Sequence, residues 1–137
     1  MTRKNGKSIV ISDASIKKSN EISMAKLNKG LTLNQMQLLS YAIFSTQKNG
    51  ATVFHKAEFE KQFNIDEYRT NHAKIDSEKS LELKVSTVDL ANDCFEFLNV
   101  FTRMTYRKGT FVFEWNTNFL PHILDLKERY IINDLTV

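Results

Sequence analysis

The chain has 137 residues, of which 42% are hydrophobic and 26% are charged, a balance typical of one soluble globular domain. Cys94 is the only cysteine, which excludes an internal disulfide and favours a reducing compartment. No apolar run approaches the ~18 residues that suggest a membrane-spanning helix. The apolar segment near the start, residues 9–11, is too short for a signal peptide. We therefore expect a cytoplasmic protein without membrane contact.

The net charge of +3 permits a polyanionic partner without requiring one. The positive charge is concentrated near the start, where the first 29 residues hold seven Lys or Arg side chains against two acidic ones. We interpret residues 1–18 as a flexible basic arm and residues 19–137 as one domain. Nucleic-acid contact by Lys17 and Lys18 is the functional interpretation of the arm, and an unspecific mobile tail is the alternative.

The first predicted elements follow this arm. Residues 19–29 fit either a short strand or an opening turn of helix, and their periodicity does not decide between the two. Thr32 and Gln35 have the spacing of a capping box, which predicts a helix that starts there and ends near Lys48. Its expected buried stripe consists of Leu33, Met36, Leu38, Leu39, Ala42, Ile43 and Phe44.

A helix-turn-helix is predicted next. Residues 51–55 fit a short strand, and the following helix begins near Lys56 and ends at Asn64. A third helix is expected from Asp66, whose carboxylate suits a helix N-terminus, to Leu81. In such an arrangement the third helix is the one presented to a groove of DNA.

The remainder of the chain predicts a strand over residues 83–88, a turn at 91–93 and a long aromatic hairpin. One long strand is expected over residues 95–106 and a second over residues 110–115, because apolar side chains recur at every second position. Their tight turn is Arg107-Lys108-Gly109. We expect the aromatic side chains to pack in a core and the basic tip, from Arg103 to Lys108, to point away.

A final amphipathic helix carries Pro121 in its first turn, where the missing N–H costs least. Residues 131–137 fit one more strand or the start of a linker. The predicted fold class is therefore α+β: a winged helix-turn-helix, with helices packed on a small antiparallel sheet and a long aromatic-rich β-hairpin wing.

Exposed polar residues of the third helix, the hairpin and the arm are the candidate contacts to double-stranded DNA. They are Arg69, Asn71, Lys74, Lys79, Arg103, Arg107, Lys108, Lys17 and Lys18. On the third helix, neighbouring carboxylates at Glu67, Asp76, Glu78 and Glu82 make the segment nearly neutral. The alternative for that helix is an ordinary solvated face.

The sequence predicts no enzyme, no metal and no cofactor. His55, His72 and His122 are scattered without metal-ligand spacing, and the four glycines do not form a phosphate-binding loop. The His-hydrophobe-His pair that a rolling-circle initiator needs is missing. An enzyme acting on DNA ends is the least favoured hypothesis.

Three segments carry a resemblance to a known family. Lys18-Ser19-Asn20-Glu21, LTLNQMQLLSYAI (residues 31–43) and FLPHILDLKERY (residues 119–130), together with the phenylalanine-rich hairpin, are similar to bacterial plasmid replication initiators of the Rep family. These are theta-type initiators with two tandem winged-helix domains. The resemblance covers residues 18–130. The segment DSEKSLELK, residues 76–84, departs from it by being more polar than the leucine-rich segment of the family.

The resemblance implies an amino-terminal winged-helix domain that dimerises and contacts DNA at origin repeats (iterons). It also implies recruitment of host replication proteins, a role in plasmid copy control and, as a further expectation, repression of the protein's own promoter. A second domain, with stronger base reading, is expected outside this chain. The alternative is a protein-interaction module that dimerises or holds a host replication factor and binds little DNA of its own.

Overall fold

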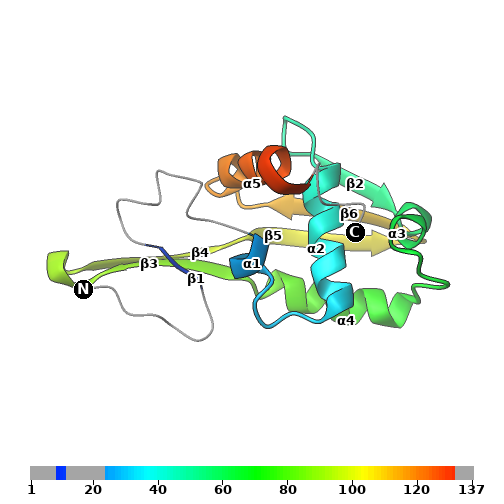
Figure 1. Ribbon diagram of the computed structural model, residues 1–137, viewed down its shortest axis with the longest axis horizontal. Coiled ribbons are helices and arrows are strands. Elements are labelled where there is room, and N and C mark those ends of the chain that lie inside the picture. The colour runs from blue at the N-terminus through cyan, green and yellow to red at the C-terminus, as the bar shows by residue number, and fades with distance from the viewer. Residues whose placement is uncertain (1–8, 12–23, 132–137) are drawn as a thin grey trace.

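The computed structural model describes residues 9–11 and 24–131, which form two three-stranded sheets and several helices (Figure 1). The strands are β1 (Ile9–Ile11), β2 (Thr52–His55), β3 (Lys84–Asp89), β4 (Cys94–Asn99), β5 (Phe101–Arg107) and β6 (Thr110–Trp115). The helices are α1 (Met24–Leu27), α2 (Leu33–Ser45), α3 (Lys56–Phe63), α4 (Thr70–Leu81) and α5 (Leu120–Leu126). A 3-10 turn spans Leu90–Asn92, and a π-helical turn spans Lys127–Ile131. The predicted α+β class is confirmed.

The central helix α2 begins at the predicted capping box. The Thr32 hydroxyl accepts a hydrogen bond from the Gln35 N–H at 3.2 Å, and the Gln35 side-chain oxygen accepts one from the Thr32 N–H at 3.0 Å. The helix ends at Ser45, earlier than predicted, because Thr46 turns to extended backbone and forms a bridge with Thr52.

The predicted buried stripe of α2 is correct in its centre and wrong at its ends. Leu38, Leu39 and Ile43 are fully buried, whereas Leu33 is 65% exposed and Phe44 is 38% exposed. Ala42 is buried as predicted, and the buried face is completed by Gln35 and Tyr41, which were not predicted. It lies against the sheet of order β2-β6-β5 (Figure 1). Aromatic side chains of that sheet, among them Phe54, Phe111 and Phe113, belong to the core.

The second strand of the predicted hairpin packs as expected. In β6, Phe111, Phe113 and Trp115 are buried, and between them Val112 is half-buried and Glu114 is exposed. Alternation thus places the aromatic residues on the face that α2 covers. The indole N–H of Trp115 donates to the hydroxyls of Thr46 and Thr52, at 3.0 and 2.8 Å. Without these bonds, the indole N–H would be buried in the core without a hydrogen-bond acceptor.

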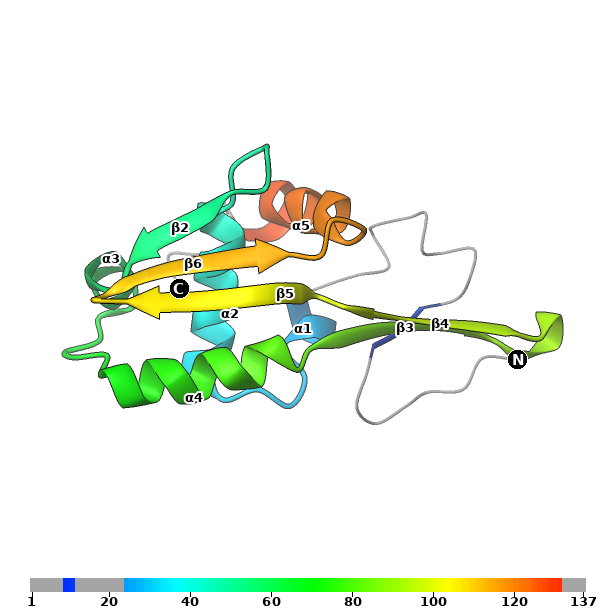
Figure 2. The same cartoon turned by 180° about the vertical axis from the view of Figure 1, so that it is seen from behind.

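The predicted single strand over residues 95–106 is wrong. It is divided at Val100 into β4, which pairs with β3, and β5, which pairs with β6 (Figure 2). Val100 is fully buried, its N–H donates to the Leu83 carbonyl, and its own carbonyl accepts from the Asn116 N–H. These partners, distant in sequence, divide the strand at Val100, although the alternation of apolar residues in the sequence continues through this position. β3 and β4 therefore form a hairpin that extends from one end of the molecule (Figure 2).

The aromatic residues of that extension are not in the core. Phe95 is 67% exposed and Phe97 is 52% exposed, so the prediction that they are buried is wrong. Phe101, beyond the division, is buried at 1% exposure and stacks on Trp115. Whether an aromatic residue of residues 95–106 is buried therefore depends on which of the two sheets its strand belongs to.

Part of the predicted basic arm has defined structure. Residues 9–11 form β1, which pairs in parallel with β3 with Ile9 opposite Val85. The open edge of β3 explains this, because unpaired backbone groups readily accept another extended segment. Further along, α1 shows that the helical alternative for residues 19–29 holds at Met24–Leu27. α5 carries Pro121 at its start, as predicted.

Candidate nucleic-acid interface

The helix-turn-helix is made by α3 and α4. At the start of α3, the His55 ring nitrogen Nδ1 accepts a hydrogen bond from the Ala57 N–H at 3.0 Å. The Glu58 carboxylate accepts one from the His55 N–H, also at 3.0 Å, which completes a second capping box. α3 ends at Asn64 in the left-handed conformation with φ 55°, as asparagine favours. The predicted bounds of this helix are confirmed.

The third helix begins later than predicted: α4 starts at Thr70, with Arg69 rather than Asp66 as its N-cap residue. Tyr68 is the physical reason. Its side chain is 1% exposed and packs 4.9 Å from the ring of Phe59, and its N–H donates to the Glu60 carboxylate at 2.5 Å. Drawing Tyr68 into the core keeps the preceding residues out of helical geometry.

The four predicted contact residues on α4 are all exposed, as expected, because the buried face of the helix is made by Ala73, Asp76 and Ser80. Each of the three cations has a carboxylate near it. The pairs are Arg69–Glu67 at 3.6 Å, Lys74–Glu78 at 3.9 Å and Lys79–Glu82 at 3.7 Å. Such exposed pairs add little to stability, but they offset the positive potential of the helix.

The hairpin turn is different. Lys108 and Gly109 have φ angles of 48° and 91°, the two positive values that a two-residue turn of this hand requires. Arg107 and Lys108 are exposed, and neither forms an ion pair with a residue in the described part of the chain. Arg103, by contrast, lies in the middle of β5 and pairs with Glu114 at 3.6 Å. The basic tip is therefore narrower than predicted.

We expected the turn to project freely, but the structure shows that it does not. The Gly109 carbonyl accepts a hydrogen bond from the Lys56 N–H at 2.7 Å, which ties the turn to the start of α3. A Cβ added to Gly109 would lie 2.6 Å from Nε2 of His55. The wing is thus short and fixed against the helix-turn-helix.

One end of the molecule brings these groups together. The Tyr106 hydroxyl at the end of β5 lies 3.4 Å from the Thr70 hydroxyl in the first turn of α4. Figure 2 shows the start of α4, the turn between β5 and β6, and α3 at this end. We call Arg69, Thr70, Asn71, Arg107 and Lys108 the basic end. Lys79 lies in the last turn of α4, and Lys17 and Lys18 lie outside the described residues.

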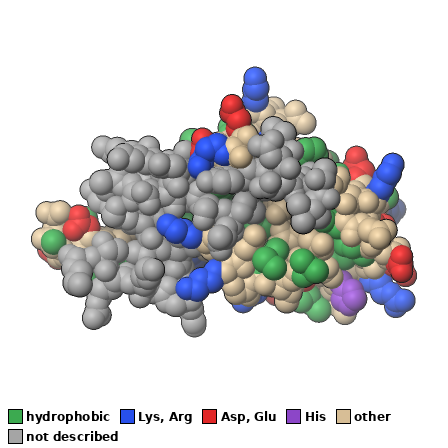
Figure 3. Space-filling model, viewed as in Figure 1, with side chains coloured by type: hydrophobic (Ala, Val, Ile, Leu, Met, Phe, Trp, Pro, Cys, Tyr) green, Lys and Arg blue, Asp and Glu red, His purple; other side chains and the backbone are tan. Residues whose placement is uncertain are grey.

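The start of α4 contributes positive potential of its own. Its N-terminus has no side-chain cap and no acidic residue in the first turn. The first N–H groups of a helix lack partners within it, and the helix dipole favours an anion there. On the face in Figure 3, Lys and Arg side chains lie beside acidic ones near α3, so that face is not uniformly basic. Tyr106 and Thr70 were missed at the sequence level, because only their tertiary contact marks them.

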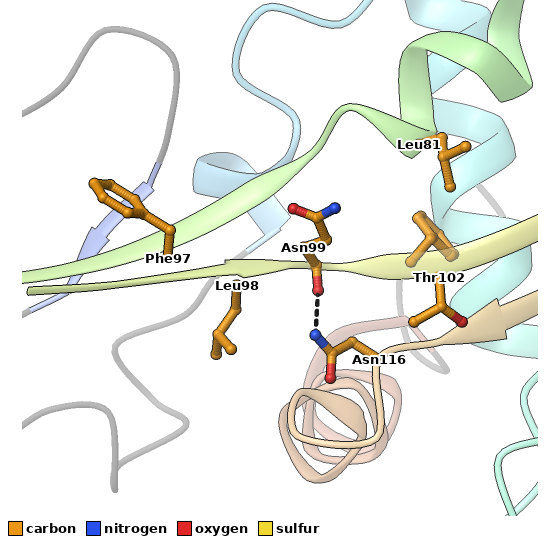
Figure 4. A pocket seen from close by; sticks show the side chains of 7 residues that line it. Leu81, Phe97, Leu98, Asn99, Thr102 and Asn116 are labelled. Atoms are coloured by element: carbon orange, nitrogen blue, oxygen red, sulfur yellow. Dashed lines mark hydrogen bonds between the residues drawn. The ribbon is translucent and has the colours of Figure 1, made fainter.

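A second feature lies at the opposite end. Phe95, Phe97 and Leu90 are each at least half exposed on the β3–β4 extension. At its base, where β4 passes into β5, a shallow open hollow is lined by Leu81, Phe97, Leu98, Asn99, Phe101, Thr102 and Asn116 (Figure 4). The Asn116 side-chain amide donates to the Asn99 carbonyl at 2.9 Å and fixes this junction.

The described residues contain no group of three His, Cys, Asp or Glu side chains arranged to hold a metal ion. Within the same residues, no helix is both long and apolar enough to cross a membrane.

The order α2, β2, α3, α4, β5, β6, with a sheet of order β2-β6-β5 and a turn beside the third helix, defines a winged-helix domain. The family described as "Initiator Replication protein, WH1" matches residues 15–136. The chain belongs to this family, and it is the first winged-helix domain of a plasmid replication initiator. No curated protein and no solved structure matches it significantly.

Proposed function

We propose that this domain binds the repeated duplex sequences of a plasmid origin, in the bacterial cytoplasm, as a step in starting replication. The observation that carries the proposal is the basic end, where Arg107 and Lys108 follow Tyr106, whose hydroxyl lies 3.4 Å from that of Thr70 in the first turn of α4, a turn without acidic residues. Membership of the initiator family adds the biological setting. The domain acts by binding, and catalysis has no part in the proposal.

The exposed groups of the basic end divide by the contact each suits. Arg107 and Lys108 are placed for phosphate oxygens, because they stand on a fixed turn without a competing carboxylate among the described residues. Asn71, exposed in the first turn of α4, is our first choice for a base edge, with Arg69 as the second. Like Arg69, the side chains of Lys74, Lys79 and Arg103 each have a nearby carboxylate, so these four carry less weight than Arg107 and Lys108.

The test is fluorescence anisotropy with an origin-repeat duplex and a scrambled duplex over a salt series. The double variant R107Q/K108N removes two charges, and asparagine tolerates the positive φ of Lys108. We expect it to flatten the salt slope by about two units, roughly one for each phosphate contact. The matched control K74Q/K79Q removes the same charge from the paired face of α4 and should change the slope less.

The outcomes separate the hypotheses. A native slope in R107Q/K108N would refute the assignment of the basic end. Equal binding of wild type to both duplexes would mean that the domain binds the DNA backbone without sequence preference, and that another part of the initiator recognises the sequence. No binding even at low salt would remove the proposed function. Lys17 and Lys18, outside the described residues, remain predicted contacts that a chain starting at residue 19 would test in the same assay.

A specific observation also favours dimerisation. Phe95 and Phe97 are exposed on a strand that pairs with β3 alone among the described strands. An open edge beside exposed apolar side chains is a typical surface for a second chain. We propose that two copies meet through β4. Host replication proteins are the other candidates for this surface, and control of the protein's own promoter would follow from a DNA-bound dimer.

Sedimentation equilibrium tests this part. The variant F95S/F97S should be monomeric at concentrations where wild type is dimeric, with its affinity for the duplex retained. V53S is the control, because Val53 is 56% exposed on a different sheet. A dimer that persists in F95S/F97S would place the contact elsewhere.

A further inference from the structure

The buried face of α4 offers little apolar surface. It consists of Ala73, Asp76 and Ser80, while the large apolar side chains of the helix, Ile75 and Leu81, are 48% and 39% exposed. Hydrophobic packing is non-directional and scales with apolar area, so an alanine and two polar residues cannot define the rotation of a helix strongly. The position of α4 must depend on more directional contacts.

Asp76 supplies those contacts. Its side chain is only 7% exposed, and each carboxylate oxygen has a donor. Oδ2 accepts a hydrogen bond from the Tyr68 hydroxyl at 2.5 Å, and Oδ1 accepts one from the Gln35 side-chain N–H at 3.2 Å. Hydrogen bonds to an ionised acceptor are among the stronger and more directional ones in proteins. They connect α4 to the turn before it and to the start of α2.

Both partners are themselves held. The other end of the Gln35 amide accepts from the Thr32 N–H in the capping box of α2, so the amide cannot rotate without losing a bond. The Tyr68 N–H donates to Glu60, and its carbonyl accepts from the Lys56 ammonium at 3.4 Å; both residues belong to α3. Burial, together with the hydrogen bond to Asp76, raises the pKa of Tyr68 far above its usual value, so its hydroxyl remains a donor.

We infer that Asp76 is a positioning residue: with Gln35 and Tyr68 it forms a lock that sets the placement of α4, and thereby of Asn71 and Arg69, relative to the wing turn. This deepens the proposed function and rests on it for its consequence in DNA binding. The lock joins α4 to α2 directly through one buried carboxylate, and it joins α4 to α3 through the backbone of Tyr68. A network of this kind favours one placement of the helix, because breaking any of its bonds leaves a buried polar group without a hydrogen-bond partner.

Gln35 allows a test that leaves α2 intact. In Q35E the carboxylate can still accept from the Thr32 N–H, as glutamate does in capping boxes, but it faces Asp76 without a donor. Adding D76N restores a donor and an acceptor with their positions reversed, and the side-chain oxygen of the introduced asparagine can still accept from Tyr68. The double variant Q35E/D76N also has the net charge of the wild type.

Two measurements are made on the whole chain at a temperature where circular dichroism shows every variant folded. Duplex affinity by anisotropy should fall roughly tenfold in Q35E, and hydrogen exchange over Thr70–Leu81 should accelerate by about the same factor, since close hydrogen-bonded pairs couple at this level. Both should return to within about threefold of wild type in Q35E/D76N. Exchange over Leu120–Leu126 should not change, which separates release of α4 from general loss of stability.

Native affinity and native exchange in Q35E would overturn the lock, and so would a double variant no better than Q35E. Faster exchange over α5 as well as α4 would show that the network contributes only to overall stability, and would also overturn the inference. Failure of the wild type to bind the duplex would remove the proposed function alone, because hydrogen exchange measures the lock without DNA.

Discussion

Truncation of two phenylalanines to alanine gives a direct test of the division of the aromatic hairpin at Val100. Phe111 is fully buried, with its ring 5.0 Å from that of Phe54 and 4.9 Å from that of Tyr106. Phe97 is 52% exposed on the β3–β4 extension. A buried Phe→Ala substitution costs about 3–5 kcal/mol, because lost transfer energy is added to a cavity. A half-exposed side chain gives up about 1 kcal/mol, roughly half the transfer value.

The assay is urea unfolding followed by circular dichroism, repeated at several protein concentrations. F111A should lower the free energy of unfolding by about 3–5 kcal/mol at every concentration, which corresponds to a melting temperature roughly 10 °C lower or more. F97A should cost about 1 kcal/mol in dilute solution, and more only where the protein is dimeric. Equal costs in dilute solution would refute the placement of Phe97 outside the core.

Two further predictions concern single positions. G109A should destabilise the fold by about 1–3 kcal/mol in chemical unfolding, because φ is 91° and the added Cβ would meet the His55 ring at 2.6 Å; G30A, with φ 85° and nothing within 4 Å of its Cβ, should cost less. Burial lowers the pKa of His122, although Asp125 opposes the shift, so the unfolded chain binds the proton more readily. Stability should therefore fall as pH drops below about 6.5, and an unfolding series in H122Q should show less of this dependence.

Local chemistry made much of the fold predictable. The capping box at Thr32 and Gln35, the left-handed Asn64 and the positive φ of Gly109 each depend on residues within four positions of one another. Such signals hold wherever tertiary contacts agree with them. The division at Val100 could not be predicted, because its hydrogen-bond partners, Leu83 and Asn116, lie 16 or more residues away.

The candidate site was predictable only in part, for a similar reason. The near-neutral charge of α4 could be inferred from carboxylates close in sequence, and Lys74–Glu78 bears this out. The true start of the helix could not be inferred from the sequence, because contacts to Phe59 and Asp76 draw Tyr68 into the core. Those contacts come from other parts of the fold, so the local sequence does not show that Tyr68 lies before the helix.

The positions of the two surfaces in the molecule lead to a stricter expectation than either does alone. The β3–β4 extension and the basic end lie at opposite ends of an elongated domain (Figure 1). Sites that are distant and share no partners contribute additively. Changes at Phe97 should therefore leave the salt slope of DNA binding unchanged, and changes at Arg107 should leave assembly unchanged. A symmetric dimer formed through β4 would also hold its two basic ends far apart, so that both could bind one duplex only at widely spaced half-sites. A dimer that binds closely spaced half-sites through both copies would contradict assembly through β4.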